Sequence, residues 1–197
     1  MISNFVNLRT HTNYSLSEGM LTSDYISKFC KNNLQPACAI SDTSNLFGVF
    51  EFSEKLLSHG VQPLIGMQIN IFDNNYDQKS NEIVLISKNE IGYKNLVFLA
   101  NQVNNCVSLN PQKAIEVKLL EKYNEGLIVL GGGPENGYIG FPASRENLIV
   151  SNARSQILKR IFKNNFYIEI QRNGLERDKR AEPVLLNLAK DLMIPIV

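Results

Sequence analysis

Histidine is scarce in this sequence, with His11 and His59 the only two among 197 residues. A polynuclear metal centre needs several imidazoles and carboxylates that converge, because each divalent ion takes about four to six nitrogen or oxygen ligands. We therefore do not expect a histidine-rich centre of this kind. His59 precedes Gly60 at the expected end of a helix, where a cation near the carbonyl terminus is ordinary.

Cysteine is also rare and irregularly spaced. Cys30, Cys38 and Cys106 form neither a CxxC pair nor a zinc-finger pattern, and three cysteines cannot all pair within one chain. The spacing therefore favours free thiols in a reducing cytoplasm over a disulfide framework or a zinc site.

Charge and hydropathy add further exclusions. The formal net charge is +1 and the sequence pI is about 7.7, so no global electrostatic force attracts the chain to nucleic acid or to an anionic membrane. The first residues lack a basic stretch followed by an apolar core, and no apolar run approaches the roughly 18 residues of a membrane span. We expect a cytoplasmic protein without membrane contact that reaches DNA only locally or through another part of a larger molecule.

What the sequence does contain is a regular alternation of short β-rich apolar runs with longer amphipathic stretches, typical of repeated βα units around a parallel sheet or barrel. Strands are expected at 5–10, 37–40, 63–72, 83–87, 127–130 and 166–171, with the start of a seventh at 194–197. Helices are expected from Ser23, capped by Thr22 or Ser23, and at 46–57, 93–104, 117–123, 152–162 and 177–192, with a polar turn at 73–77. No linker interrupts the pattern, so residues 1–197 are expected to form a single domain cut from a longer polypeptide.

Six segments carry a resemblance to a known family. They are 5–15 (FVNLRTHTNYS), 39–48 (AISDTSNLFG), 62–68 (QPLIGMQ), 87–96 (SKNEIGYKNL), 166–174 (FYIEIQRNG) and 188–195 (LAKDLMIP). Together and in this order, the chain from 5 to 197 resembles the N-terminal PHP (polymerase and histidinol phosphatase) domain in the alpha subunits of bacterial C-family replicative DNA polymerases. The resemblance implies an α/β fold of PHP type, a distorted (β/α)7 barrel, here C-terminally truncated. It also implies a metal site at the carboxyl ends of the strands.

The first part of that implied site has lost one of its ligands. Where metal-binding members of the family carry His-x-His, this chain has Arg9 and His11. The guanidinium of Arg9 is permanently charged and cannot coordinate a metal ion. Glu18, which precedes Gly19, matches an acidic ligand of the family and could still bind a metal.

The later parts of the implied site show similar replacements. Asp42 matches the aspartate of an Asp-His pair in which the histidine is replaced by Thr43. Gln68 stands where a Gly-x-Glu motif carries its glutamate, so a bridging carboxylate is exchanged for a neutral amide. Glu82 and Asn173 stand at positions that other members frequently fill with histidine.

The resemblance thus predicts a remnant pocket rather than an active centre. Its six residues are Arg9, His11, Glu18, Asp42, Thr43 and Gln68. We expect no catalytic residue, no bound metal and no other cofactor in this chain, with His11, Glu18 and Asp42 as weak candidate ligands for one ion. Arg9 is expected to take over the charge role of the metals and to pair with Glu18 or Asp42. His11 is interpreted as a hydrogen-bonded, partly buried histidine.

The function implied by the resemblance is that of a structural and docking domain within a replicative polymerase. The full-length polymerase would carry out DNA-directed DNA synthesis with Mg²⁺ held by carboxylates outside this chain. The implied partners are the remaining polymerase domains of the same chain, the proofreading exonuclease subunit and, through the full-length protein, DNA. An alternative of another class stays open, a metal-dependent phosphoesterase with residual 3′–5′ exonuclease or pyrophosphatase activity that uses a metal-activated hydroxide.

Overall fold

The computed structural model of the chain describes residues 5–73, 81–105 and 113–197. The polar turn expected at 73–77 lies outside these ranges except for its first residue, and Cys106 lies outside them as well. Cys30 and Cys38 are buried free thiols. Among the helices in the described ranges, none is long and apolar enough to cross a bilayer.

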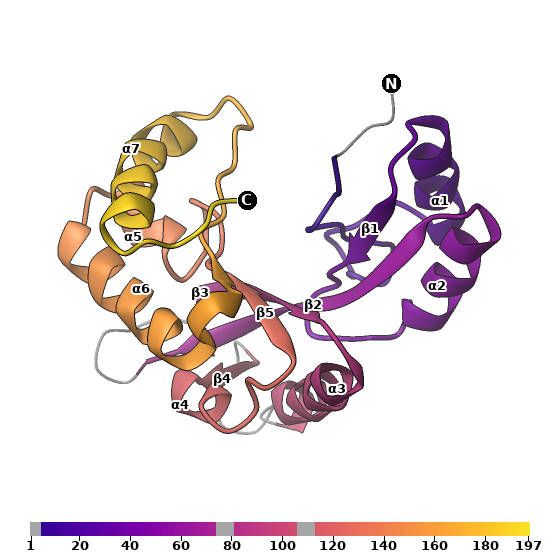
Figure 1. The fold of residues 1–197 in the computed structure, drawn as a ribbon, viewed down its shortest axis with the longest axis horizontal. Helices are drawn as coiled ribbons and strands as arrows, with labels where there is room; N and C mark the ends of the chain where they lie inside the picture. The colour runs from indigo at the N-terminus through magenta and orange to yellow at the C-terminus, as the bar shows by residue number, and fades with distance from the viewer. Residues whose placement is uncertain (1–4, 74–80, 106–112) are drawn as a thin grey trace.

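One mixed sheet runs through the middle of the molecule (Figure 1). The described strands are β1 (Ala37–Ile40), β2 (Gln62–Phe72), β3 (Asn81–Ser87), β4 (Ala114–Glu116), β5 (Leu127–Leu130) and β6 (Phe166–Tyr167). Their order in the sheet is β1-β2-β3-β5-β6, and β4 pairs with β2 away from this path. β1 runs parallel to β2, and β5 runs parallel to β6.

The expected all-parallel arrangement is wrong for β3, which runs antiparallel to both β2 and β5. The connection between β2 and β3 explains this direction, because only residues 73–80 separate the two strands. A parallel pair needs a crossover of about a dozen residues or more, usually a helix, whereas an antiparallel pair can be joined by a short loop. The α/β class is confirmed, with a mixed sheet in place of repeated βα units throughout.

Within the described ranges, the sheet does not close into a ring. On one margin, residues 5–10 form an extended segment rather than a regular strand, and Asn7 accepts a backbone hydrogen bond from Ala39 of β1 at 2.7 Å. On the other margin, Ile168 donates to Pro195 at 2.9 Å and accepts from Val197 at 3.0 Å, so the expected seventh strand begins to pair beside the continuation of β6. The described residues therefore leave the sheet unpaired between these two margins.

Helices cover the outer face of the sheet. They are α1 (Ser23–Asn32), α2 (Val49–Ser58), α3 (Glu90–Asn105), α4 (Val117–Leu120), α5 (Gly140–Ser144), α6 (Leu148–Phe162) and α7 (Glu176–Asp191), with a 3₁₀ turn at Lys163–Asn165. Thr22 caps α1 as predicted, because its side chain accepts a hydrogen bond from the backbone N–H of Tyr25. Figure 1 shows α1 and α2 at one end of the sheet and α5, α6 and α7 at the other.

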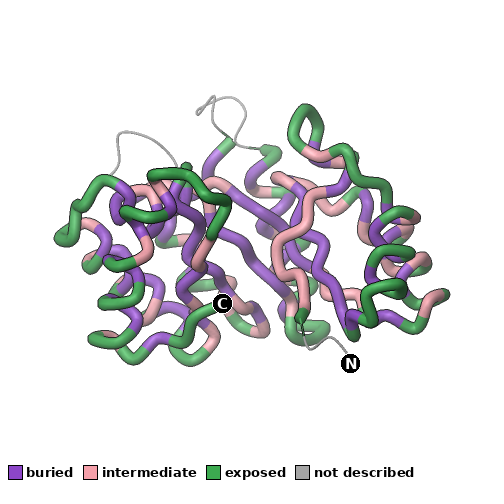
Figure 2. The backbone as a smooth tube through the Cα atoms, turned by 90° about the horizontal axis from the view of Figure 1, so that it is seen from above, coloured by how far each residue is buried: buried purple, intermediate pink, exposed green. Residues whose placement is uncertain are grey.

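The alternation of side chains along the strands divides the sheet into two faces. Met67, Ile69 and Leu85 are fully buried in the main core against the helices, and Figure 2 shows the strands buried between the exposed outer turns of those helices. Gln68 and Val84 are cross-strand partners and therefore share the opposite, inner face. This inner face is apolar toward one end and polar toward the other, where the candidate site lies.

Candidate functional site

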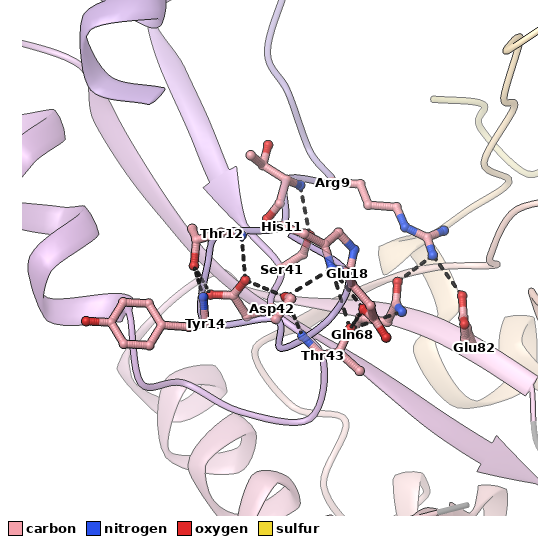
Figure 3. A network of polar contacts seen from close by, with 12 residues as sticks. Arg9, His11, Thr12, Tyr14, Glu18, Ser41, Asp42, Thr43, Gln68 and Glu82 are labelled. Carbon is pink, nitrogen blue, oxygen red and sulfur yellow. Dashed lines mark hydrogen bonds and ion pairs between the residues drawn. The ribbon is translucent and has the colours of Figure 1, made fainter. Parts of the chain in front are cut away.

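The guanidinium of Arg9 lies beside Gln68 and Glu82 at one side of a network of polar contacts (Figure 3). Its Nη2 donates to Oε2 of Glu82 at 2.9 Å and to Oε1 of Gln68, and its Nη1 donates to Oε1 of Glu169 at 3.0 Å. Both ion pairs lie largely out of solvent, since the Glu169 side chain is 7% exposed and that of Arg9 is 21% exposed. We refer to Arg9, Gln68, Glu82 and Glu169 as the arginine cluster.

The fold brings the arginine cluster together from four separate segments. Gln68 lies on β2 and Glu82 on the neighbouring β3, where the antiparallel register places Glu82 opposite Asn70, two residues from Gln68 on the same face. Glu169 follows β6, two residues after Tyr167, which is paired with Leu130 of β5. Period-two alternation therefore points these side chains to the inner face, toward the extended segment that carries Arg9.

The electrostatics of the arginine cluster favour a permanently charged arginine. Burial alone lowers the pKa of Arg9, but the carboxylates of Glu169 and Glu82 outweigh this effect and raise that pKa above its usual value. Arg9 therefore carries its positive charge at neutral pH. Its two carboxylate partners each gain a charge-assisted hydrogen bond.

Asp42 belongs to a second, adjacent group of polar residues. One carboxylate oxygen accepts hydrogen bonds from the backbone N–H of Thr12 and the hydroxyl of Ser15, both at 2.6 Å, and the other accepts from the Thr12 hydroxyl at 2.6 Å. Asp42 is 1% exposed. Its oxygens are thus committed to fixing the loop that follows Arg9, and the expected pairing of Arg9 with Asp42 or Glu18 is replaced by pairing with Glu82 and Glu169.

His11 lies between the two groups. Its Nδ1 is 3.1 Å from the Ser15 hydroxyl, 3.4 Å from the Thr43 hydroxyl and 3.5 Å from a carboxylate oxygen of Glu18. Burial lowers the pKa of His11, and the nearby charge of Arg9 lowers it further against the opposing effect of the carboxylates around it. This surrounding agrees with the interpretation of His11 as a hydrogen-bonded, partly buried side chain.

All six residues predicted for the remnant pocket lie in one region. The link between the two groups is Thr43, whose hydroxyl donates to Glu18 at 2.5 Å and accepts from the amide of Gln68 at 3.4 Å. The prediction did not include Glu169 or the two hydroxyl residues that bind Asp42, Thr12 and Ser15. The strand segment 166–171 held a usable signal for Glu169, since a charged residue alternates there with apolar ones.

The residues present do not fit a polynuclear metal centre. Arg9, His11, Glu18, Gln68 and Glu82 line a cavity of about 430 Å³. Within the described ranges, no three His, Cys, Asp or Glu side chains are grouped so that they could hold a metal ion. The fixed cation of Arg9 repels a divalent ion and is bound to the two carboxylates that would otherwise be available for one. We therefore derive no chemical step through a metal at this site.

Comparison with known proteins agrees with this fold. The family model described as "PHP domain" matches residues 7–173, and the chain belongs to the PHP domain family. A crystal structure from Bifidobacterium adolescentis, provisionally described as a metal-dependent phosphoesterase, superposes with a TM-score of 0.58 at 13% identity over 97% of this chain and 85% of that one. This likeness shows that the folds are shared.

Curated relatives define the branch of the family. DNA polymerase III subunit alpha of Caulobacter vibrioides is 33% identical over 198 residues, covering 98% of this chain and 17% of the relative. The same subunit of Rickettsia felis is 34% identical, with 98% of this chain and 16% of the relative covered, and that of Campylobacter jejuni is 30% identical, with 100% and 17% covered. The chain therefore spans about a sixth of the length of the curated relatives that it matches.

Proposed function

We propose that this chain is the PHP region of a DNA polymerase III alpha subunit and serves there as a structural and docking domain without phosphoesterase activity. The arginine cluster is the observation that carries the second part. A guanidinium bound to Glu82 and Glu169 supplies the positive charge that the pocket carboxylates need, and it contributes no metal-coordinating group. The Arg9 side chain thereby stabilises the inner face of the sheet without a metal ion.

The alternative function, a metal-dependent phosphoesterase with residual 3′–5′ exonuclease or pyrophosphatase activity, is not better supported. Its support is the fold shared with the Bifidobacterium adolescentis structure, and at 13% identity that likeness bears on the fold alone. The ion pairs of Arg9 and the three donors bound to Asp42 count against it, because each removes carboxylate oxygens that a metal would require.

Metal-binding and hydrolysis assays directly test the proposal that the chain lacks phosphoesterase activity. Calorimetric titration with Mn²⁺ or Zn²⁺ is expected to show no stoichiometric binding, and bis(p-nitrophenyl) phosphate is expected to remain uncleaved by the chain. The matched control is a triple variant, Arg9→His, Thr43→His and Gln68→Glu, which restores two imidazoles and one carboxylate and is expected to bind Mn²⁺ measurably. Stoichiometric metal in the unaltered chain, with hydrolysis that His11→Ala abolishes, would overturn the proposal.

The proposed partners are those of a replicative polymerase: the remaining domains of the same chain, the proofreading exonuclease subunit and, through the whole polymerase, DNA. Mg²⁺ for nucleotidyl transfer would be held by carboxylates outside this chain. Support for docking comes from apolar side chains exposed on the N-terminal part, where Phe47 and Phe50 are each 76% exposed. Phe47 precedes α2 and Phe50 lies in its first turn, at the end of the sheet away from α6.

Co-elution of the full-length polymerase with its exonuclease subunit tests the docking role. We expect Phe47→Ser combined with Phe50→Ser to weaken co-elution by about tenfold or more, because exposed aromatic residues are frequent anchors of interfaces. Ile149→Ser is the matched control, since this residue of α6 is 83% exposed at the other end of the molecule. Equal retention of the exonuclease by both variants would place its docking surface elsewhere.

A further inference from the structure

The sequence contains the dipeptide Asn-Gly twice, at 136–137 and at 173–174. Asparagine is chemically labile in this context, because glycine carries no side chain that hinders the attack of its own nitrogen on the preceding side-chain amide. Whether the attack occurs depends on how the fold holds that nitrogen. The two Asn-Gly pairs lie in opposite surroundings.

The Asn-Gly pair at 173–174 lies in the exposed turn that precedes α7. Asn173 donates its backbone N–H to Oδ2 of Asp178 at 2.8 Å, and Leu175 donates to the same oxygen at 3.2 Å. Between these two fixed points, the N–H of Gly174 has no hydrogen-bond partner among the described residues. Gly174 has φ +82°, and a Cβ built on it would meet nothing within 4 Å. The attacking nitrogen is therefore unbonded, and the space around it is open.

The Asn-Gly pair at 136–137 is held by backbone hydrogen bonds on both of its residues. The N–H of Gly137 donates to the C=O of Gly133 at 2.9 Å, and the C=O of Asn136 accepts from the N–H of Glu82 at 2.8 Å. Gly137 is buried, and a Cβ built on it would overlap the carbonyl carbon of Gly132. Attack by the nitrogen of Gly137 therefore requires this loop to open first.

We propose that Asn173 is a site of spontaneous deamidation, at which the nitrogen of Gly174 attacks Cγ of Asn173 and forms a succinimide ring. The bond between Cγ and Nδ2 breaks, and Nδ2 leaves as ammonia with the proton of the Gly174 N–H. Water then adds to one of the two ring carbonyl carbons and breaks its bond to the Gly174 nitrogen, which regains a proton. Hydrolysis at Cγ gives aspartate, and hydrolysis at the main-chain carbonyl carbon gives isoaspartate. Water is the only co-reactant, and no atom is oxidised or reduced.

The two products differ in their effect on α7. Both place a new carboxylate before the N-terminus of this helix, where the helix dipole favours negative charge. Aspartate keeps the main chain unchanged, so the N–H groups of residues 173 and 175 still reach Asp178. Isoaspartate inserts a methylene carbon into the main chain between these two donors, so one carboxylate oxygen no longer fits both. The isoaspartate form therefore loosens the start of α7.

Incubation in mildly alkaline buffer, followed by peptide mapping with mass spectrometry, measures the loss of amide at each asparagine. In the folded chain we expect Asn173 to react at least about tenfold faster than Asn136, because only the nitrogen of Gly174 is free of a hydrogen bond. In urea-denatured chain the two sites should react at similar rates. Equal rates in the folded chain, or an intact Asn173 there while the denatured chain reacts, would overturn the proposal.

Thermal melting of two variants tests the effect on α7. After incubation, the isoaspartate fraction of the unaltered chain, separated by ion exchange, should melt about 2 to 4 °C lower than fresh protein. Asn173→Gln is the matched control, because its longer side chain closes the corresponding ring much more slowly, and it should melt unchanged after the same incubation. Asn173→Asp reproduces the other product and should melt like fresh protein. An isoaspartate fraction that melts like Asn173→Asp would contradict the loosening of α7.

Discussion

At the scale of single residues, Arg9 decides the character of the site. We expect Arg9→Ala to lower the free energy of unfolding by about 1 to 3 kcal/mol, because it leaves the largely buried carboxylates of Glu82 and Glu169 without their cation. Urea denaturation at neutral pH measures this change. Arg172→Ala is the matched control, since it breaks an ion pair with Glu182 in which the arginine side chain is 72% exposed.

The control should lose far less stability than Arg9→Ala. Equal effects of the two substitutions would mean that water, rather than Arg9, compensates the carboxylates in the pocket. Arg9→Lys adds a further comparison, because lysine keeps the charge but cannot present the planar set of donors that reaches Glu82, Gln68 and Glu169 together. We expect its stability to lie between those of the unaltered chain and Arg9→Ala.

His11 gives the site a dependence on pH. Its pKa in the folded chain lies below the ordinary value of 6.5, first because of burial and then because of Arg9. Between these two values the unfolded chain binds a proton that the folded chain does not, so stability is fully present above the ordinary pKa and falls as the pH falls through this window. Glu18, Asp42 and Glu82 act in the opposite direction and limit the effect.

Thermal melting across this acidic window measures the effect of His11. The unaltered chain should lose stability on acidification, and His11→Gln should lose less, because glutamine binds no proton. His59→Gln serves as a control for the removal of a histidine. If both substitutions flatten the pH profile equally, the dependence belongs to other groups in the protein.

The positions of the site residues could be predicted from the sequence, but their pairings could not. Arg9, His11 and Asp42 come directly from strand ends that the sequence pattern identifies, and the structure brings them into one region. Partner choice depends on the register between β2 and β3 and on which face Glu169 occupies. Both are set by long-range contacts that one sequence does not display. The sequence alone therefore favours Glu18 and Asp42, the carboxylates of the matched motifs, as partners of Arg9.

At the scale of elements, close backbone approach fixes where α3 begins against the loop before β5. Gly126 has φ +71°, and a Cβ placed on it would lie 2.5 Å from the backbone nitrogen of Gly92 in the first turn of α3. Gly126→Ala should therefore cost the strain of a left-handed alanine, about 1 to 2 kcal/mol, and a further 1 to 3 kcal/mol, roughly, for displacing the helix.

Gly60 provides the matched control for Gly126, the glycine that precedes β5. Its φ is +73°, but a Cβ there would meet nothing within 4 Å, so Gly60→Ala should cost only the backbone strain. Urea denaturation of the two alanine variants separates strain from steric contact. Equal destabilisation of the two variants would show that α3 shifts to accommodate the added methyl group without a loss of stability.

Local sequence signals predicted the positions of helices and strands better than they predicted the directions of the strands. The Thr22 cap of α1 and the limits of β1 at 37–40 follow from residues close in the chain, and the structure confirms them. Helix α3 begins at Glu90, three residues before the prediction, because the side chain of Asn89 accepts a hydrogen bond from the N–H of Gly92. Strand β3 was predicted correctly in position, but its reversed direction depends on the short connection from β2.

At the scale of the whole molecule, the open sheet implies a gradient of stability from its centre to its margins. β3 is paired on both sides, with β2 and with β5, and Val84 and Leu85 are fully buried. The margins at residues 7–10 and 195–197 are each paired on one side only among the described residues. Opening a margin therefore breaks fewer hydrogen bonds and exposes less apolar surface than opening the centre.

Amide hydrogen exchange followed by NMR tests this gradient. The amides of Val84 and Leu85 should exchange only through global unfolding, whereas the amide of Ile196, which faces away from the continuation of β6, should exchange at least about a hundredfold faster. Val197 is the internal comparison, because its N–H is bonded to Ile168 and should exchange more slowly than that of Ile196. Protection of Ile196 equal to that of Val84 would mean that the sheet is closed in solution, because an amide at an unpaired margin has no hydrogen bond to slow its exchange.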